Sequence, residues 1–225
     1  MEMKTGRLER TKQIVRKLAK AVAGAVLVSG LMLAPKLAHA DSIELMAGHN
    51  QTTIDLKASA EITKKLGVFM RARPSVDYDG NISSFGLVDL TINLTDGLDA
   101  VGEVQFVGGK VVPRAGVQHF IKTGDFSAYN LATLGMDSES YLELLTALKY
   151  CPALSQTLKL LAHVENVTDL DKTGHVWSTQ RIRLGVLIDG WGFGPAVDLT
   201  ETGNSPKTSD GTLGWNLGGF VSKTF

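Results

Sequence analysis

Apolar and polar residues alternate along most of the chain from residue 41 onward. In the stretch TTIDLKASAEI, isoleucine, leucine and alanine take one parity, and Asp55, Lys57 and Glu61 take the other. A period of two is typical of a β-strand with one apolar and one polar face. The pattern recurs and predicts twelve strands, near 43–49, 52–62, 66–78, 82–94, 98–107, 111–122, 126–134, 140–150, 156–167, 175–188, 191–201 and 212–225. If segment 42–50 is only a lead-in, the count falls to ten.

Clusters of Gly, Asp, Asn and Pro separate these stretches, as in DYDGN and TGNSPKTSDG. The connections are too short for a Greek key, so we expect neighbouring strands to pair as consecutive hairpins. The alternation persists for about 9–11 residues per strand, the length that a tilted strand needs to cross a bilayer. The expected fold class is therefore all-β, a transmembrane up-and-down antiparallel barrel that closes on itself and leaves no edge. A secreted soluble β-protein would show the same alternation.

The first forty residues have a different composition. Seven basic residues lie within residues 1–20, and the apolar stretch AVAGAVLVSGLMLA follows, with Pro35 directly after it. The segment AHA then ends at Ala40 and has the small-x-small form of a signal-peptidase site. This three-part order is typical of a secretory signal peptide. We therefore expect residues 1–40 to be a signal peptide cleaved after Ala40, and residues 41–225 to form the barrel; a buried helix or a retained membrane anchor is the alternative for residues 1–40.

Removal of that segment changes the charge balance. Residues 1–40 hold eight basic and two acidic residues, so the 23 of each sign in the whole chain become 15 basic and 21 acidic, a net charge of −6. A negative chain without a basic patch does not suit nucleic acid. Cys151 is the one cysteine, so no internal disulfide is possible.

The end of the chain carries a recognisable pattern. Apolar residues recur at alternate positions before the terminal aromatic residue, at Leu213, Trp215, Leu217, Val221 and Phe225. Together with the expected signal peptide and the strand meander, this resembles Gram-negative outer-membrane β-barrels. The resemblance implies an outer-membrane location, contact with membrane lipid, and recognition of the last strand by the barrel-assembly machinery through Trp215, Leu217, Val221 and Phe225. Lys223 departs from the pattern, at a position that is usually apolar.

The polar parity of the strands is rich in charge, and in a barrel it faces the lumen. The expected inward residues are Asp55, Lys57, Glu61, Arg71, Arg73, Asp77, Asp89, Glu103, Arg114, Lys122, Glu143, Lys149, Lys159, Glu165, Arg181, Arg183 and Asp198. Two arginine pairs lie five strands apart, nearly opposite each other in a ring of twelve. Such arginines can receive carboxylates. The sequence favours a narrow passive channel for small, anionic solutes, with pore-lining candidates Arg71, Arg73, Asp89, Glu103, Lys159, His163, Arg181 and Arg183. Small twelve-stranded porins for acidic sugars have a similar architecture.

Three alternatives stay open. Cross-strand pairing would absorb the inward charges into a network without any transport role. A non-conducting structural barrel is the second alternative. The third is a lipid-modifying enzyme, with His49, His175 and Ser178 near the outer ends of strands. Strict alternation would place His175 and Ser178 on opposite faces, so we expect no catalytic residues. The scattered histidines suit no metal site, and no cofactor is expected.

Overall fold

The computed structural model describes residues 39–136, 141–203 and 212–225, with the side chains of residues 39 and 40 excepted. The described residues form twelve strands and no helix. The strands are β1 (His39–Gly48), β2 (Gln51–Thr63), β3 (Leu66–Asp77), β4 (Ile82–Thr95), β5 (Leu98–Val107), β6 (Lys110–Thr123), β7 (Phe126–Gly135), β8 (Leu142–Tyr150), β9 (Leu158–Asp171), β10 (Gly174–Ile188), β11 (Trp191–Thr202) and β12 (Thr212–Thr224).

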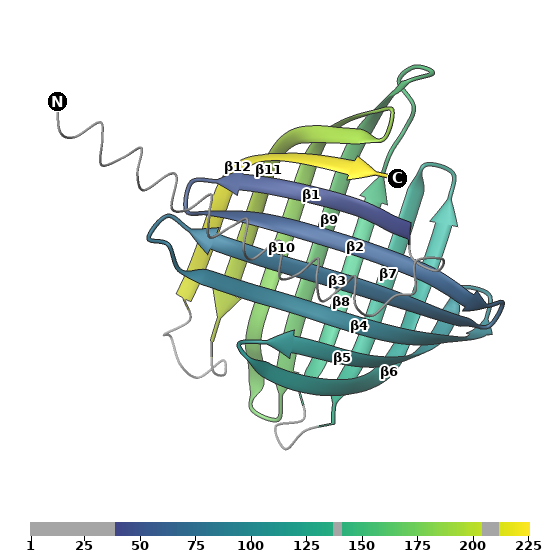
Figure 1. Ribbon diagram of the computed structural model, residues 1–225, viewed down its shortest axis with the longest axis vertical. Coiled ribbons are helices and arrows are strands. Elements are labelled where there is room, and N and C mark those ends of the chain that lie inside the picture. The colour runs from purple at the N-terminus through teal and green to yellow at the C-terminus, as the bar shows by residue number, and fades with distance from the viewer. Residues whose placement is uncertain (1–38, 137–140, 204–211) are drawn as a thin grey trace.

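The strands form one closed antiparallel barrel in which each strand pairs with its neighbours along the chain. The first and last strands close it: β1 pairs with β12 from Ser42↔Thr224 to Gly48↔Gly218. In Figure 1, β1 and β12 run side by side. The twelve-strand up-and-down barrel is therefore confirmed, and β1 is a full strand rather than a lead-in. It begins at His39, two residues before the expected mature N-terminus; cleavage after Ala40 stays a prediction.

The two faces of the wall differ as the alternation predicts. Exposed apolar side chains cover the outward face on strands all around the ring, among them Leu45, Leu90, Leu134, Leu184 and Leu217. Charged and polar side chains lie inward, and many are almost fully buried there. An apolar exterior around a polar interior is the arrangement of an outer-membrane-type barrel. Among the described residues, no helix is long and apolar enough to cross a membrane.

The two rims of the barrel carry different connections. We call the rim at which β12 ends the C-terminal rim; its connections are 64–65, 96–97, 124–125, 151–157 and 189–190. Asp189 and Gly190 both have positive φ, of 50° and 79°, as a tight hairpin turn requires. We call the opposite rim the far rim. It carries the connections 49–50, 78–81, 108–109 and 172–173, together with those between β7 and β8 and between β11 and β12. These last two and 151–157 are the three longest connections of the barrel.

Candidate functional site

Arg71 lies at the centre of a charged layer inside the barrel. Its guanidinium donates to both oxygens of Asp55 on the adjacent strand β2, with the Nε to Oδ1 distance at 2.8 Å. It also donates to Glu165 on β9, at 3.1 and 3.0 Å. Because β3 and β9 lie on opposite sides of the ring, this contact crosses the lumen. Arg71 and Glu165 are 7% and 3% exposed, so the pair is buried between the two walls.

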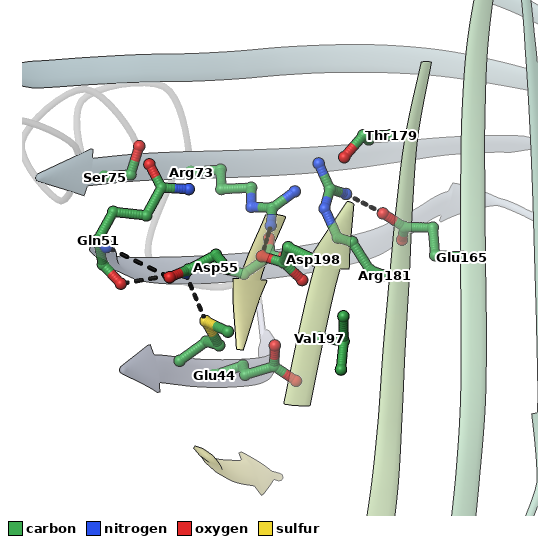
Figure 2. Close-up of polar contacts among 12 residues, drawn as sticks. Glu44, Gln51, Asp55, Arg73, Ser75, Glu165, Thr179, Arg181, Val197 and Asp198 are labelled. Carbon is green, nitrogen blue, oxygen red and sulfur yellow. Dashed lines mark hydrogen bonds and ion pairs between the residues drawn. The ribbon is translucent and has the colours of Figure 1, made fainter. Parts of the chain in front are cut away.

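The other three arginines among the pore-lining candidates are also paired with carboxylates. Arg181 on β10 donates to Glu165, so one carboxylate receives two guanidinium groups. Arg73 on β3 reaches Asp198 on β11 at 3.1 Å. Arg183 donates to the same Asp198 at 2.7 Å and to Glu44 on β1 at 2.8 Å. Figure 2 draws the Arg73–Asp198 and Arg181–Glu165 contacts as dashed lines. All four arginines predicted from the sequence are therefore neutralised in a layer that crosses the lumen.

A cavity of about 170 Å³ adjoins this layer. Five cationic side chains and three carboxylates line it, so the formal charge of the lining is +2: the lining includes Lys57, Arg71, Lys149, Arg181, Arg183, Glu44, Asp55 and Glu165, with His163 and the hydroxyl residues Ser42, Ser222 and Thr224. Arg73 and Asp198 lie next to the lining as a neutral pair. The volume corresponds to roughly five or six water molecules.

Two lysines supply the charge surplus of the cavity. The Lys57 ammonium lies 3.8 Å from Glu165 and 4.0 Å from Asp55, and its side chain is 29% exposed. Lys149 on β8 is exposed and, within the described residues, forms no ion pair. Both carboxylates near Lys57 are already occupied by guanidinium groups. The ammonium groups are therefore the cationic groups most available to a bound anion.

A second polar cluster occupies another part of the inner wall, on β4 to β9. Arg114 lies 3.5 Å from Glu103 and 3.7 Å from Asp169, and it donates to the Thr133 hydroxyl at 2.9 Å. Gln105 donates to Glu103 and to Glu143, each at 2.9 Å. Asp89 is the cross-strand neighbour of Glu103. This cluster is rich in carboxylates and does not contribute to the cavity lining.

The structure places the predicted pore-lining residues in three groups. Arg71, Arg73, Arg181 and Arg183 meet in the charged layer. Asp89 and Glu103 lie together in the acidic cluster, 1% and 2% exposed. His163 lines the cavity, whereas Lys159 does not. Of the residues that the candidate set omitted, Glu165 and Lys149 were visible as inward charges in the alternation; Glu44 was missed because its segment was the doubtful first strand.

Two clusters of buried apolar side chains also lie in the barrel. Met46, Leu161, Ala196 and Phe220 form one buried cluster, against which Cys151 packs. Val101, Leu131, Leu145 and Val167 form another, with Trp177 against it. The last strand carries one large apolar residue, Phe220, on its otherwise polar parity. This side chain faces inward and packs in the first cluster. Burial raises the pKa of the Cys151 thiol, which lies in the connection 151–157.

The last strand has the arrangement expected of it. Trp215, Leu217, Val221 and Phe225 are exposed on the outward face, at 54%, 50%, 48% and 74%. Lys223 shares that parity, and its ammonium donates to the Asp189 carbonyl at 2.8 Å and lies 5.1 Å from the Trp191 ring centroid. The Lys223 side chain therefore links the β10–β11 turn to β12. This contact explains why a charged residue occupies a position of β12 that is usually apolar.

One expectation about candidate catalytic residues is wrong. The register of β9 and β10 shifts between His175 and Trp177, so β10 contains a bulge. As a result His175 pairs with Leu170 and Ser178 pairs with Thr168, two positions of the same outward parity. His175 and Ser178 therefore share a face. Glu201 on β11 is the cross-strand partner of Ser178 on that face. Ser178 is 3% exposed, and its hydroxyl accepts from Gln180 at 3.3 Å.

The third candidate, His49, has a different environment. It lies in the connection 49–50 at the far rim, where its Nδ1 accepts from the Leu217 amide at 3.0 Å and its ring lies 4.2 Å from that of Trp215. Both contacts join the β1–β2 hairpin to β12. In the described part of the chain, no group of His, Cys, Asp and Glu is arranged to hold a metal ion.

Two of the three comparisons with known proteins find no match. No family model matches the chain, and no curated protein matches it. Among solved structures, LpxR from Salmonella typhimurium matches with 9% sequence identity and a TM-score of 0.44, over 82% of this chain and 99% of that one. That identity is too low to transfer the role of any residue. The class that the structure itself defines is a closed, twelve-stranded, outer-membrane-type barrel.

Proposed function

We propose that this chain is an outer-membrane protein, exported by its signal peptide and inserted by the barrel-assembly machinery, and that it forms a narrow channel of low conductance with a preference for small anions. The observation that carries the proposal is the cavity of about 170 Å³ with a lining charge of +2. A small carboxylate or phosphate has the size and the charge to occupy it.

In this proposal the arginines do not have the anion-binding role that the sequence suggested for them. The arginines are held by Asp55, Glu165, Glu44 and Asp198, so they act as the constriction rather than as the anion receptors. Lys57 and Lys149 attract the anion instead. On this proposal the layer of crossing ion pairs narrows the path of the anion, which is why we expect low conductance and a small size limit.

Swelling of vesicles that contain the purified barrel tests this function. Vesicles in an isosmotic potassium salt of a small anion, with valinomycin present to carry the potassium, should swell. Vesicles in sodium acetate with a protonophore should swell much more slowly, because acetic acid crosses the lipid and sodium must then pass through the barrel. Lys149→Gln and Lys57→Gln together should abolish the difference between the two salts. Lys172→Gln, in the β9–β10 turn and outside the cavity lining, is the matched control and should leave it intact. Absence of swelling in every salt would show an occluded barrel and overturn the proposal.

A second candidate function is favoured by the bulge in β10. It places His175, Ser178 and Glu201 on one outward face near the far rim, which suits hydrolysis of an acyl ester of a membrane lipid. In that reaction the Ser178 oxygen attacks the ester carbonyl, His175 accepts the serine proton and passes it to the departing alkoxide, and water then releases the fatty acid. Release of fatty acid from phospholipid micelles tests it. Ser178→Ala must abolish the release and Ser84→Ala, an exposed serine on β4, must preserve it; no release by the wild-type protein removes this candidate.

A further inference from the structure

Five polar side chains interrupt the apolar outward face in a single row. His119, Asn130, Thr146, Asn166 and Gln180 lie on the five consecutive strands β6 to β10. Each is the direct cross-strand partner of the next, through the pairs His119↔Asn130, Asn130↔Thr146, Thr146↔Asn166 and Asn166↔Gln180. Their inward neighbours, such as Gln118, Leu131 and Glu165, lie on the opposite parity. We call these five residues the outward polar row.

The row satisfies only part of its own hydrogen-bonding capacity. The Thr146 hydroxyl donates to Asn130 Oδ1 at 3.1 Å, and Gln180 Nε2 donates to Asn166 Oδ1 at 3.1 Å. Among the described residues, the Asn130 amide nitrogen and the His119 ring have no hydrogen-bond partner, and Asn130 is exposed. An amide carries two donor hydrogens and an acceptor oxygen, so several positions in the row stay open.

The row does not run parallel to the membrane surface. Four strand spacings of about 4.8 Å give the row a length of roughly 19 Å. Strands in such barrels tilt by about 40°, so a row perpendicular to them descends by roughly 12 Å through an apolar band of about 25 Å. On the proposed membrane location, the row therefore passes through the hydrocarbon region, where lipid offers no hydrogen-bond partner. Lipid headgroups cannot cover both of its ends.

The surroundings of the row allow another backbone to approach. Ala128 and Ala132 flank Asn130 on β7, and Ala115 and Ala162 lie on the outward parity of β6 and β9. Small side chains beside polar ones are typical of protein–protein contacts inside membranes, because close approach gives packing and hydrogen bonds together.

We propose that the outward polar row is the interface at which a second copy of this chain docks in the membrane. The row is complementary to itself: amides and hydroxyls each offer a donor and an acceptor, and no carboxylate or ammonium group in the row opposes contact between like surfaces. In the associated form, Asn130 and Thr146 of one copy lie against the same surface of its partner, and the open amide donors are satisfied there. The proposal rests on the membrane location and is independent of the channel.

Sedimentation equilibrium in density-matched detergent micelles, with the full barrel, tests the proposal. We expect an oligomer for the wild-type protein, and Asn130→Leu with Thr146→Val should weaken association at least tenfold. Ser84→Val, an outward polar-to-apolar change on β4, is the matched control and should leave the mass unchanged. A monomeric wild-type barrel, or an oligomer that the double variant leaves unchanged, would overturn the proposal.

A second variant guards against misfolding of the first. Ala128→Cys in a Cys151→Ser background keeps the polar row intact and places one thiol beside Asn130. Oxidation in vesicles should join two copies through this cysteine, whereas a cysteine at Ala58, on the outward face of β2, should stay monomeric. Equal cross-linking at the two positions would show random collision and would also overturn the proposal. Channel activity is measured separately, so loss of one proposal does not affect the reading of the other.

Discussion

Glu165 is the carboxylate on which the charged layer depends most. It receives Arg71 and Arg181, and the Lys57 ammonium lies 3.8 Å away. Its side chain is only 4% exposed. Replacement by glutamine keeps the size and one acceptor oxygen but removes the negative charge. Arg71 retains Asp55, whereas Arg181 has no other carboxylate within 4.0 Å among the described residues.

The cost of this change follows from leaving a buried charge without its partner. Breaking a buried ion pair costs about 3–5 kcal/mol. Because glutamine still accepts one hydrogen bond, we expect Glu165→Gln to lose about 3 kcal/mol of stability, or roughly two orders of magnitude in the unfolding equilibrium. The double variant Glu165→Gln with Arg181→Gln removes the orphaned charge, so its loss should be smaller than the sum of the single losses.

Urea unfolding of the barrel in lipid vesicles, followed by the fluorescence of its three tryptophans, measures these differences. Glu61→Gln is the control, because Glu61 lies on β2 at the same parity as Asp55 but is exposed. It should change the stability by less than about 0.5 kcal/mol. If Glu165→Gln is as mild as the control, or if the double variant is simply additive, the charged layer does not join β3 to β9 and the reasoning above fails.

Two further predictions concern the seam and the cysteine. Gly218→Ala should block closure of β12 on β1, because its added Cβ would lie 1.9 Å from the Ala47 carbonyl oxygen. In a refolding gel assay the control Gly214→Ala should fold normally, because the nearest contact of its added Cβ is at 3.8 Å. Equal folding of both variants would contradict this prediction. Alkylation of Cys151 by iodoacetamide should rise with pH through a midpoint above the ordinary thiol pKa of about 8.5, since burial raises its pKa and lowers its thiolate fraction at neutral pH. A midpoint at or below that value would contradict the buried position against the Met46 and Phe220 cluster.

The alternation of side chains predicts the barrel well because a period of two is a local property of each strand. Every expected strand is present, and the disputed first strand closes the ring. The inward and outward parity of Arg71, Glu165 and Trp215 follows from the same rule. One local irregularity defeats it: the extra residue near Val176 reverses the parity of His175, and nothing in GHVWSTQ marks a bulge.

The alternation of side chains cannot predict which inward residues contact each other across the lumen. Alternation indicates that Arg71 and Glu165 face inward, but their meeting depends on the tilt and on the long side chains that bridge the ring. For that reason the sequence left both arrangements open, arginines available in the lumen or arginines paired with carboxylates, and the structure shows each of the four paired. The outward polar row is visible only once the register is known, because His119 and Gln180 are far apart in sequence and share a line only through the pairs between them.

The zero-current potential of the wild-type barrel in a planar bilayer, under a tenfold potassium chloride gradient, tests the central claim most directly. We expect a potential displaced toward the equilibrium potential of chloride, and a shift toward zero when Lys57 and Lys149 are both replaced by glutamine. A potential on the potassium side, or a bilayer that stays silent although the inserted barrel is folded, would contradict an anion-preferring channel.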